Sequence, residues 1–107
     1  MKEKEFFEKS VKNNIFPRND ALKQIILKKI MQDFDFKKIY TEKQVDETIK
    51  KYFDDYTLLR RELVNFGYMQ RDALKMEYQV RKKELTKEDY EKNTLLRRHA
   101  KDVGIKL

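Results

Sequence analysis

The chain has no cysteine and no tryptophan, and its 107 residues include one proline, two glycines and one histidine. Without cysteine there is no disulfide framework, thiol nucleophile or cysteine-based zinc site. No apolar run approaches the length of a membrane span, and the residues after Met1 do not form a secretory signal pattern. The scarcity of helix breakers among many Lys, Glu, Leu and Ile residues favours a helix-rich fold. We therefore expect a helical, cytoplasmic protein of one domain's length.

Residue types that carry catalysis are also scarce. His99 is the single histidine and lies in a Lys- and Arg-rich segment, and Ser10 is the single serine. A Ser-His-Asp arrangement would need residues from two peripheral segments. Asp54 and Asp55 are adjacent, so they do not project together as an acid/base pair does. With no glycine-rich phosphate loop either, the sequence predicts a protein that is not an enzyme and holds no cofactor or metal.

Charge is unevenly placed along the chain. The 26 Lys and Arg residues outnumber the 19 Asp and Glu residues, which gives a net charge of +7. Residues 19–80 carry twelve basic and eleven acidic side chains, whereas residues 81–107 carry nine basic and five acidic ones. Basic proteins can bind nucleic acid by neutralising phosphates, but a Lys-rich surface also serves solubility alone. The excess charge lies at the chain ends, chiefly the C-terminal one.

The first third of the chain predicts two helices and a connector. Residues 2–12 place Phe6, Phe7 and Val11 on one helical face. The connector 15–17 (Ile-Phe-Pro) is expected to be extended, because the residue before proline avoids the α region, and to dock its two apolar side chains on the core. Asn19 or Asp20 can cap a second helix that reaches about Asp33. Phe34 and Phe36 are expected to fold back onto the core.

The middle of the chain shows clear helix-start signals. Residues 39–41 (Ile-Tyr-Thr) read as a very short strand, after which Thr41 and Gln44 form a T-x-x-Q capping box. Asp54-Asp55 marks a tight joint before a helix over about 56–66. Leu59 and Leu63 lie on its buried face, and Thr57, Arg61 and Asn65 lie on the opposite one. Gly67 is expected to end this helix in a left-handed conformation.

After Gly67 the period changes to that of strands. Residues 68–71 and 76–80 predict a hairpin whose turn, 72–75, lacks the Gly or Asn that tight hairpins favour. Thr86 and Asp89 then form a second capping box. The helix that follows is expected to run to Gly104 with a thin apolar stripe of Leu96, Ala100 and Val103. Such a stripe indicates partial packing on the domain or on a second copy.

The order of elements is helix, short strand, helix, helix and hairpin. It predicts an α+β fold, mostly helical with a small β-hairpin: a winged helix-turn-helix-like domain with helical extensions at both ends. The boundaries are residues 1–80 for the domain, including its N-terminal helix, and 81–107 for a basic helical extension.

In that architecture helix 56–66 can lie in the major groove of duplex DNA while the hairpin touches the backbone. Arg61 suits the two acceptors of guanine, and Asn65 suits adenine. Because residues 19–80 are nearly neutral, strong binding needs the basic tail. The candidate nucleic-acid-binding residues are Thr57, Arg60, Arg61, Asn65, Arg71, Lys75, Arg81, Lys82, Lys83, Arg97 and Arg98.

Several of these segments resemble a prokaryotic family. Residues 16–18 (FPR), 40–45 (YTEKQV) and 54–67 (DDYTLLRRELVNFG) are similar to the domain of unknown function 2087, and Tyr78 falls where that family carries a hairpin tyrosine. The resemblance spans roughly residues 6–80. Because the family occurs alone and fused to helix-turn-helix regulators, the resemblance implies a regulatory, winged-helix-like module and supplies no catalytic residue. The hairpin turn departs from the family's usual Asp-Gly, and the basic segment after Val80 extends past the usual domain end.

Two further functions remain open from the sequence. A protein-interaction or homodimerisation module using the C-terminal helix would explain the near-neutral domain and the thin apolar stripe. An RNA- or ribosome-associated protein would share the charge distribution that favours DNA. Duplex DNA binding by a transcription regulator is the reading that the element order favours.

Overall fold

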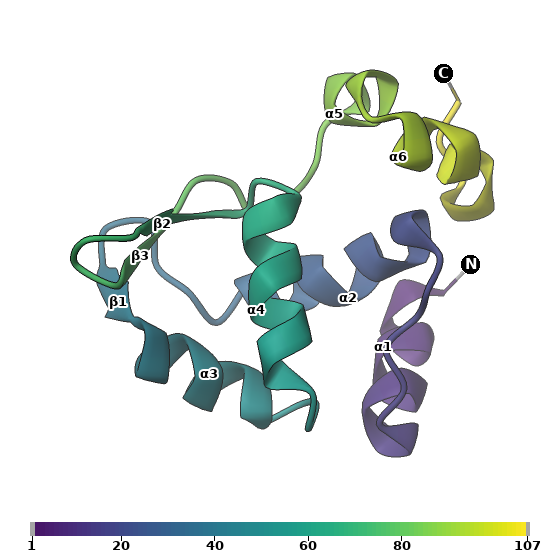
Figure 1. Ribbon diagram of the computed structural model, residues 1–107. Coiled ribbons are helices and arrows are strands. Elements are labelled where there is room, and N and C mark those ends of the chain that lie inside the picture. The colour runs from purple at the N-terminus through teal and green to yellow at the C-terminus, as the bar shows by residue number, and fades with distance from the viewer. Residues whose placement is uncertain (1, 107) are drawn as a thin grey trace.

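The computed structural model describes residues 2–106 of the chain (Figure 1). This part contains six α-helices, a 3₁₀ turn and three short strands. The helices are α1 (Glu3–Asn13), α2 (Asp20–Met31), α3 (Glu42–Lys50), α4 (Tyr56–Asn65), α5 (Lys87–Lys92) and α6 (Thr94–His99), with the 3₁₀ turn η1 (Ala100–Val103) after α6. The strands are β1 (Ile39–Thr41), β2 (Met69–Asp72) and β3 (Glu77–Val80). The predicted α+β class, mostly helical with a small hairpin, is confirmed.

The three strands form one antiparallel sheet in the order β1-β3-β2. Tyr78 at the centre of β3 pairs with Tyr40 of β1 and with Arg71 of β2. The short strand therefore joins the hairpin as a third strand, which the sequence did not specify. Because side chains alternate across a strand, Tyr78 and Val80 face inward and are buried, while Gln79 is exposed.

The main core lies between α2, α3, α4 and the inner face of the sheet. Its fully buried side chains include Ile26, Ile30, Ile49, Leu63 and Tyr68. Burying one such aliphatic side chain contributes about 1.5–3 kcal/mol. Figure 1 shows α4 at the front of the molecule with α2 and α3 behind and below it, so that one face of α4 covers this core and the other is free.

Local capping signals placed the helix starts correctly. The Asn19 side chain accepts hydrogen bonds from the backbone N–H groups of Ala21 and Leu22. The Thr41–Gln44 capping box is formed in both directions. Asp55 caps α4. Each cap satisfies backbone donors that the first turn of a helix leaves unpaired, which is worth about 0.5–2 kcal/mol.

Ile15 and Phe36, which the sequence predicts to pack on the core, are exposed. Phe16 packs edge-on against Phe53, 6.0 Å between ring centroids, but its neighbour Ile15 is 63% exposed. In the same way Phe34 is buried, whereas Phe36 is 56% exposed and lies beneath the Lys83 ammonium group. In extended or turning chain, neighbouring side chains point to different sides, so only one of each pair reaches the core.

The hairpin turn differs from the prediction by one residue. Residues 73–76 form the turn, and Met76, expected in the second strand, adopts a left-handed conformation with φ of 56°. The Asp72 carboxylate accepts hydrogen bonds from the backbone N–H groups of Leu74 and Lys75. These bonds hold a turn that contains no glycine, because an Asp side chain can replace a backbone acceptor in a turn.

The C-terminal segment is broken, not one continuous helix. The Thr86–Asp89 capping box starts α5 as predicted. Asn93 then has an extended backbone, and its side chain caps α6 by accepting from the N–H groups of Leu95 and Leu96. The chain turns there, and α6 and η1 pack on the start of α2. Leu96 and Ala100 are buried against Ala21 and Tyr90 in a second, smaller apolar cluster.

Candidate nucleic-acid interface

The outward face of α4 carries three of the candidate residues at helical spacing. Thr57, Arg61 and Asn65 follow each other at intervals of four, which places them in one row along a helix. Thr57 is half-buried, and Arg61 and Asn65 are exposed. Leu59 and Leu63, on the opposite side of α4, are fully buried. The packing of α4 on the core thus fixes which side chains point to solvent.

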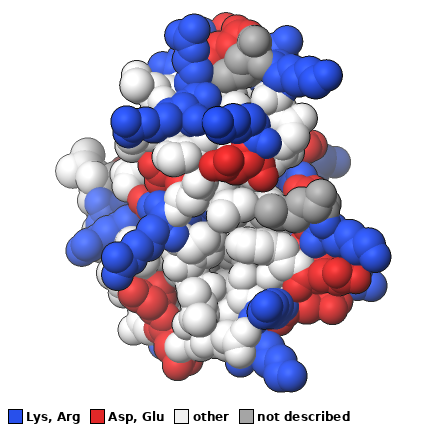
Figure 2. Space-filling model, turned by 90° about the vertical axis from the view of Figure 1, so that its right-hand side faces the viewer, with Lys and Arg blue, Asp and Glu red and all other residues white. Residues whose placement is uncertain are grey.

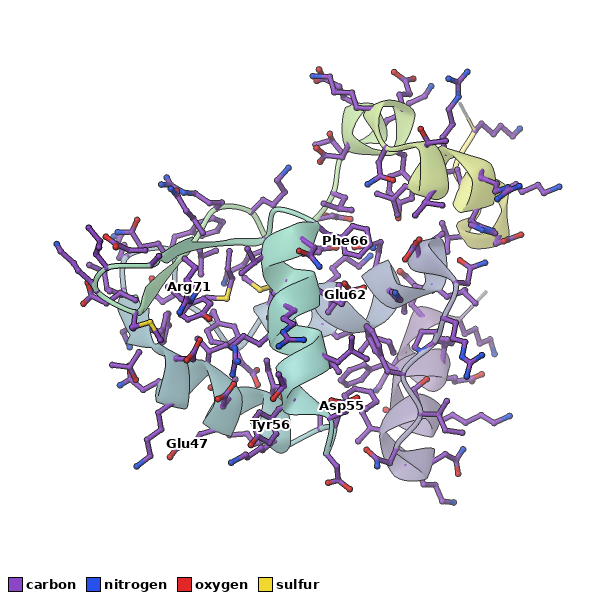
Figure 3. The ribbon with its side chains drawn as sticks, viewed as in Figure 1. Glu47, Asp55, Tyr56, Glu62, Phe66 and Arg71 are labelled. Atoms are coloured by element: carbon purple, nitrogen blue, oxygen red, sulfur yellow. The ribbon has the colours of Figure 1, made fainter. Side chains whose placement is uncertain are left out.

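Arg61 is the cation at the middle of this row. Among residues 2–106, no acidic side chain forms an ion pair with it. The Asn65 amide donates a hydrogen bond of 3.1 Å to Glu62. Glu62 itself is held by Lys23 of α2 at 2.8 Å, on the side of α4 that faces α2 (Figure 3). Arg61 is therefore free to bind a partner, whereas Asn65 would exchange an internal hydrogen bond for an external one.

Glu42, in the first turn of α3, is the centre of a polar cluster beside α4. Its carboxylate accepts a hydrogen bond of 2.6 Å from the Tyr78 hydroxyl. The Nε atoms of Arg60 and Arg71 each lie 3.5 Å from the same carboxylate oxygen. The hydrogen bond from Tyr78 is the main cause that lowers the pKa of Glu42, and the two arginines add to it while partial burial opposes it. Glu42 is thus held in its charged form and ties α3, α4 and both hairpin strands together.

Arg60 is engaged on two sides by carboxylates. Besides Glu42, its guanidinium group donates a short hydrogen bond to Asp46, and its side chain is only 16% exposed. In this geometry Arg60 links α4 to α3 and does not point to solvent as Arg61 does. Arg71 is less tightly held, because its Nη2 donates to the Met76 sulfur, which is a weak acceptor.

A cleft of about 360 Å³ separates α4 from the hairpin. We call it the α4–hairpin cleft; Figure 3 shows Arg71 on its hairpin side. The cleft is lined by Glu42, Arg60, Arg61, Val64, Asn65, Arg71 and Tyr78. Four of the candidate residues come together here. Glu42 and Tyr78 were missed as site residues, although the segments that carry the family resemblance include both.

The remaining candidate residues are dispersed. Lys75 is exposed in the hairpin turn, and Arg81 is exposed just after β3. Lys82 forms an ion pair of 3.0 Å with Asp89, and the Lys83 ammonium group lies 5.4 Å from the Phe36 ring centroid. These contacts use two of the three cations in the basic run 81–83 within the chain itself.

Arg97 and Arg98 are exposed on α6. Figure 1 places α6 and the hairpin at opposite ends of the molecule. In Figure 2, Lys and Arg side chains gather at the upper end, where the C-terminal helices lie, with acidic side chains among them and a largely uncharged area below. Arg97 and Arg98 therefore lie far from the hairpin cations Arg71 and Lys75.

Residues weighed as catalytic groups have structural partners. Asp55 caps α4, and Asp54 accepts a hydrogen bond of 3.1 Å from the Asn14 side chain. His99 Nδ1 lies 3.1 Å from Asn19 Nδ2 and 3.3 Å from an Asp102 oxygen. Within the described part of the chain, no group of three or more His, Asp or Glu side chains is arranged to hold a metal ion.

A hollow of about 480 Å³ lies between α1, α2 and the C-terminal segment. At its base the Tyr68 hydroxyl donates a hydrogen bond of 2.7 Å to Gln24, whose amide donates to the Asp20 carbonyl. Burial, with Glu3 and Glu84 nearby, raises the pKa of Tyr90 to about 12. Lys28 at the rim is paired with Glu3. Gln24, Tyr68, Lys28 and Glu3 in this lining are therefore paired within the chain.

Comparison with known proteins identifies a family and no individual relative. None of the helices between residues 2 and 106 is long and apolar enough to cross a membrane. The search of curated proteins and the search of solved structures both returned no match. Residues 14–80 match DUF2087, a family described as an uncharacterized protein conserved in bacteria, and this match includes α2, α3, α4 and the whole sheet. Since the matched segment makes up more than half of the chain, the protein belongs to the bacterial DUF2087 family.

Proposed function

We propose that the protein is a non-catalytic, cytoplasmic transcription regulator that binds duplex DNA through a winged-helix-like domain. The observation that carries the proposal is the outward row of α4, where Arg61 stands without an acidic partner next to the hairpin. The order α2, β1, α3, α4, β2, β3, with β1 completing the sheet, is the order of a winged helix. In such domains the second helix of the helix-turn-helix enters the major groove; here that helix is α4.

The side chains in the row have the chemistry of base readout. The guanidinium fork of Arg61 matches the O6 and N7 acceptors of guanine, and an asparagine amide such as Asn65 matches N6 and N7 of adenine. Thr57 can donate to or accept from either. The hairpin beside α4 presents Lys75, which can contact a backbone phosphate and fix the register of the helix on the duplex.

The charge distribution predicts weak binding by the domain alone. Arg60 and Arg71 are partly neutralised by Glu42 and Asp46, which leaves few free cations near α4. The segment 81–107 supplies additional positive charge, including Arg81, Arg97 and Arg98, which lie outside the α4–hairpin cleft. We infer that this segment adds affinity that does not depend on sequence, because contacts between cations and phosphates carry no base information.

The experiment is fluorescence anisotropy of a labelled random-sequence duplex as a function of salt. We expect binding by the full chain to weaken steeply as salt rises, since each neutralised phosphate releases a counterion. Arg61→Glu should reduce affinity for this duplex at least tenfold, because it replaces a cation at the DNA surface with a carboxylate that repels the phosphates. Arg18→Glu is the matched control, because Arg18 is an exposed arginine before α2. Equal losses for the two variants, or no binding at low salt, would overturn the proposal.

Competition separates duplex DNA from RNA. Unlabelled structured RNA should displace the labelled duplex less effectively than the same mass of unlabelled duplex, because the deep, narrow major groove of A-form RNA does not admit side chains. Stronger competition by RNA would favour the RNA- or ribosome-associated reading.

Self-association through the C-terminal helix has lost one of the two observations that favoured it. The stripe of Leu96, Ala100 and Val103 packs within the chain, with Leu96 and Ala100 each only 2% exposed. Leu95 is the large apolar side chain that α6 leaves exposed, at 52%. A single exposed leucine is ordinary for a protein surface. Light scattering of the full chain tests this reading, and a monomer is the expected result.

A further inference from the structure

We propose that the α4–hairpin cleft binds a phosphate group between Arg61 and Arg71, and that Glu42 is the internal carboxylate with which this phosphate competes. The proposal rests on the proposed function, and deepens it, only where the phosphate belongs to a duplex backbone. In that case the Nε–H donor of Arg61 contacts the phosphate and its two Nη groups contact guanine, since a guanidinium group has five donors. A free phosphate-containing ligand offers the same chemistry. The two sources are distinguished by the experiment below.

The first argument is the unused donor capacity of two guanidinium groups in one cleft. Arg61 forms no ion pair with any acidic side chain in residues 2–106. Arg71 reaches Glu42 at 3.5 Å through Nε, and its Nη2 donates to the Met76 sulfur. A thioether is a weak acceptor, whereas a guanidinium group has five donors. An oxyanion could replace the sulfur contact at little cost.

The second argument is the imbalance of charge inside the cleft. Three arginines and one glutamate line it. Glu42 divides its charge among the Tyr78 hydroxyl, Arg60 and Arg71, and Asp46 compensates only Arg60. A cleft with excess positive charge and low-dielectric walls concentrates anions.

The third argument is shape and valence. The volume of about 360 Å³ lies in the range of small-ligand sites. Arg61 of α4 and Arg71 of β2 both line the cleft, one from the helix and one from the hairpin. A tetrahedral phosphate presents oxygens in several directions and can accept from both forks, a geometry for which arginine is better suited than lysine.

Binding is tested with pyrophosphate as the free probe, at constant ionic strength, by following backbone amide and arginine Nε–Hε signals in NMR spectra of the full chain. The expected shifts are confined to Arg61, Arg71 and their neighbours Val64 and Tyr78. Arg71→Gln should weaken binding about tenfold, as expected for loss of one charge-assisted hydrogen bond. Arg18→Gln removes the same charge outside the cleft and should leave binding unchanged.

Glu42→Gln is expected to strengthen pyrophosphate binding, a gain that loss of folding would not produce. The amide retains an acceptor for Tyr78 but removes the competing charge, so pyrophosphate should bind severalfold more tightly. Glu47→Gln is the control, because Glu47 is an exposed carboxylate on α3 that points away from Arg71 (Figure 3). Equal affinity of the folded Glu42→Gln and Glu47→Gln variants would overturn the role of Glu42.

The same titrations with a short duplex identify the source of the phosphate. Shifts in the cleft with both probes, each reduced by Arg71→Gln, assign the site to a backbone phosphate. Cleft shifts with pyrophosphate alone support the cleft proposal and overturn the proposed DNA-binding function. Shifts spread over exposed Lys and Arg residues, equally sensitive to Arg71→Gln and Arg18→Gln, or no shifts with either probe, overturn the cleft proposal itself.

Discussion

The Tyr78 hydroxyl lies 2.6 Å from the Glu42 carboxylate and donates a hydrogen bond to it across 36 residues of sequence. This contact joins the middle strand of the sheet to the first turn of α3. Through the same carboxylate oxygen, Arg60 attaches α4 and Arg71 attaches β2. One glutamate therefore fixes the position of the helix and the hairpin that form the proposed interface.

Removing the tyrosine hydroxyl should destabilise the fold. Tyr78→Phe keeps the buried ring but deprives Glu42 of its strongest donor, and we expect a loss of about 1–2 kcal/mol in the free energy of unfolding. The measurement is urea denaturation of Tyr78→Phe, Glu42→Ala and the double variant. A double variant that costs less than the sum of the two single ones reports the contact. Strictly additive losses would show that the two side chains do not interact.

The pH dependence of stability should reflect Glu42. Its folded pKa is lowered from the ordinary 4.5, chiefly by the hydrogen bond from Tyr78. The folded state therefore releases this proton more readily than the unfolded state, and the stabilisation is complete above pH 4.5 and is lost as pH falls through the lower folded pKa. Carbon NMR titration of the Glu42 carboxyl should give a higher pKa in Tyr78→Phe than in the unsubstituted protein. An identical pKa in both would contradict the assignment.

Asn93 should stabilise α6 through the capping hydrogen bonds of its side chain, whatever the size of that side chain. Its side chain accepts from the backbone N–H groups of Leu95 and Leu96 at the start of α6. Asn93→Ala should cost about 1 kcal/mol, whereas Asn93→Ser, which keeps a capping oxygen, should cost little. Hydrogen exchange of the α6 amides measures the difference. Equal exchange in the alanine and serine variants would indicate that the cap contributes nothing.

Weakening the smaller apolar cluster should unfold the C-terminal segment 81–107 locally while the preceding domain stays folded. Leu96 is buried in the smaller apolar cluster with Ala21, Tyr90 and Ala100, apart from the main core. Leu96→Ala should remove about 2–4 kcal/mol of packing from that cluster. Hydrogen exchange should then speed up in α5 and α6 while the amides of β3 and α4 stay protected. Loss of protection in both regions together would mean that residues 81–107 and the preceding domain unfold as one unit.

Structural features that depend on residues close in sequence, such as helix caps, could be predicted. Features that depend on contacts between distant segments could not. The caps at Asn19, Thr41, Asp55 and Thr86 depend on residues within three or four positions, and all are present. The break at Asn93 was missed because an asparagine in a Lys- and Leu-rich segment fits a helix as well as a cap. Its choice depends on α6 packing against α2, which no local pattern reveals.

The candidate site shows the same division. The α4 row followed from helical spacing, since the buried leucines determine which side faces outward. Arg60 and Arg71 were assigned to nucleic acid from their type and position alone, but their contacts with Glu42 and Asp46 come from other elements. Charge on a residue is visible in the sequence, while the partner that neutralises it depends on the fold.

The most direct test of the account is NMR mapping of a short duplex titrated into the full chain at low salt. The account predicts that the largest shifts fall on Thr57, Arg61 and Asn65 of α4, with a second set at Lys75 in the hairpin turn. It also predicts that Arg61→Glu abolishes the α4 shifts. Shifts confined to residues 81–107, with α4 unaffected, would contradict the claim that α4 reads DNA.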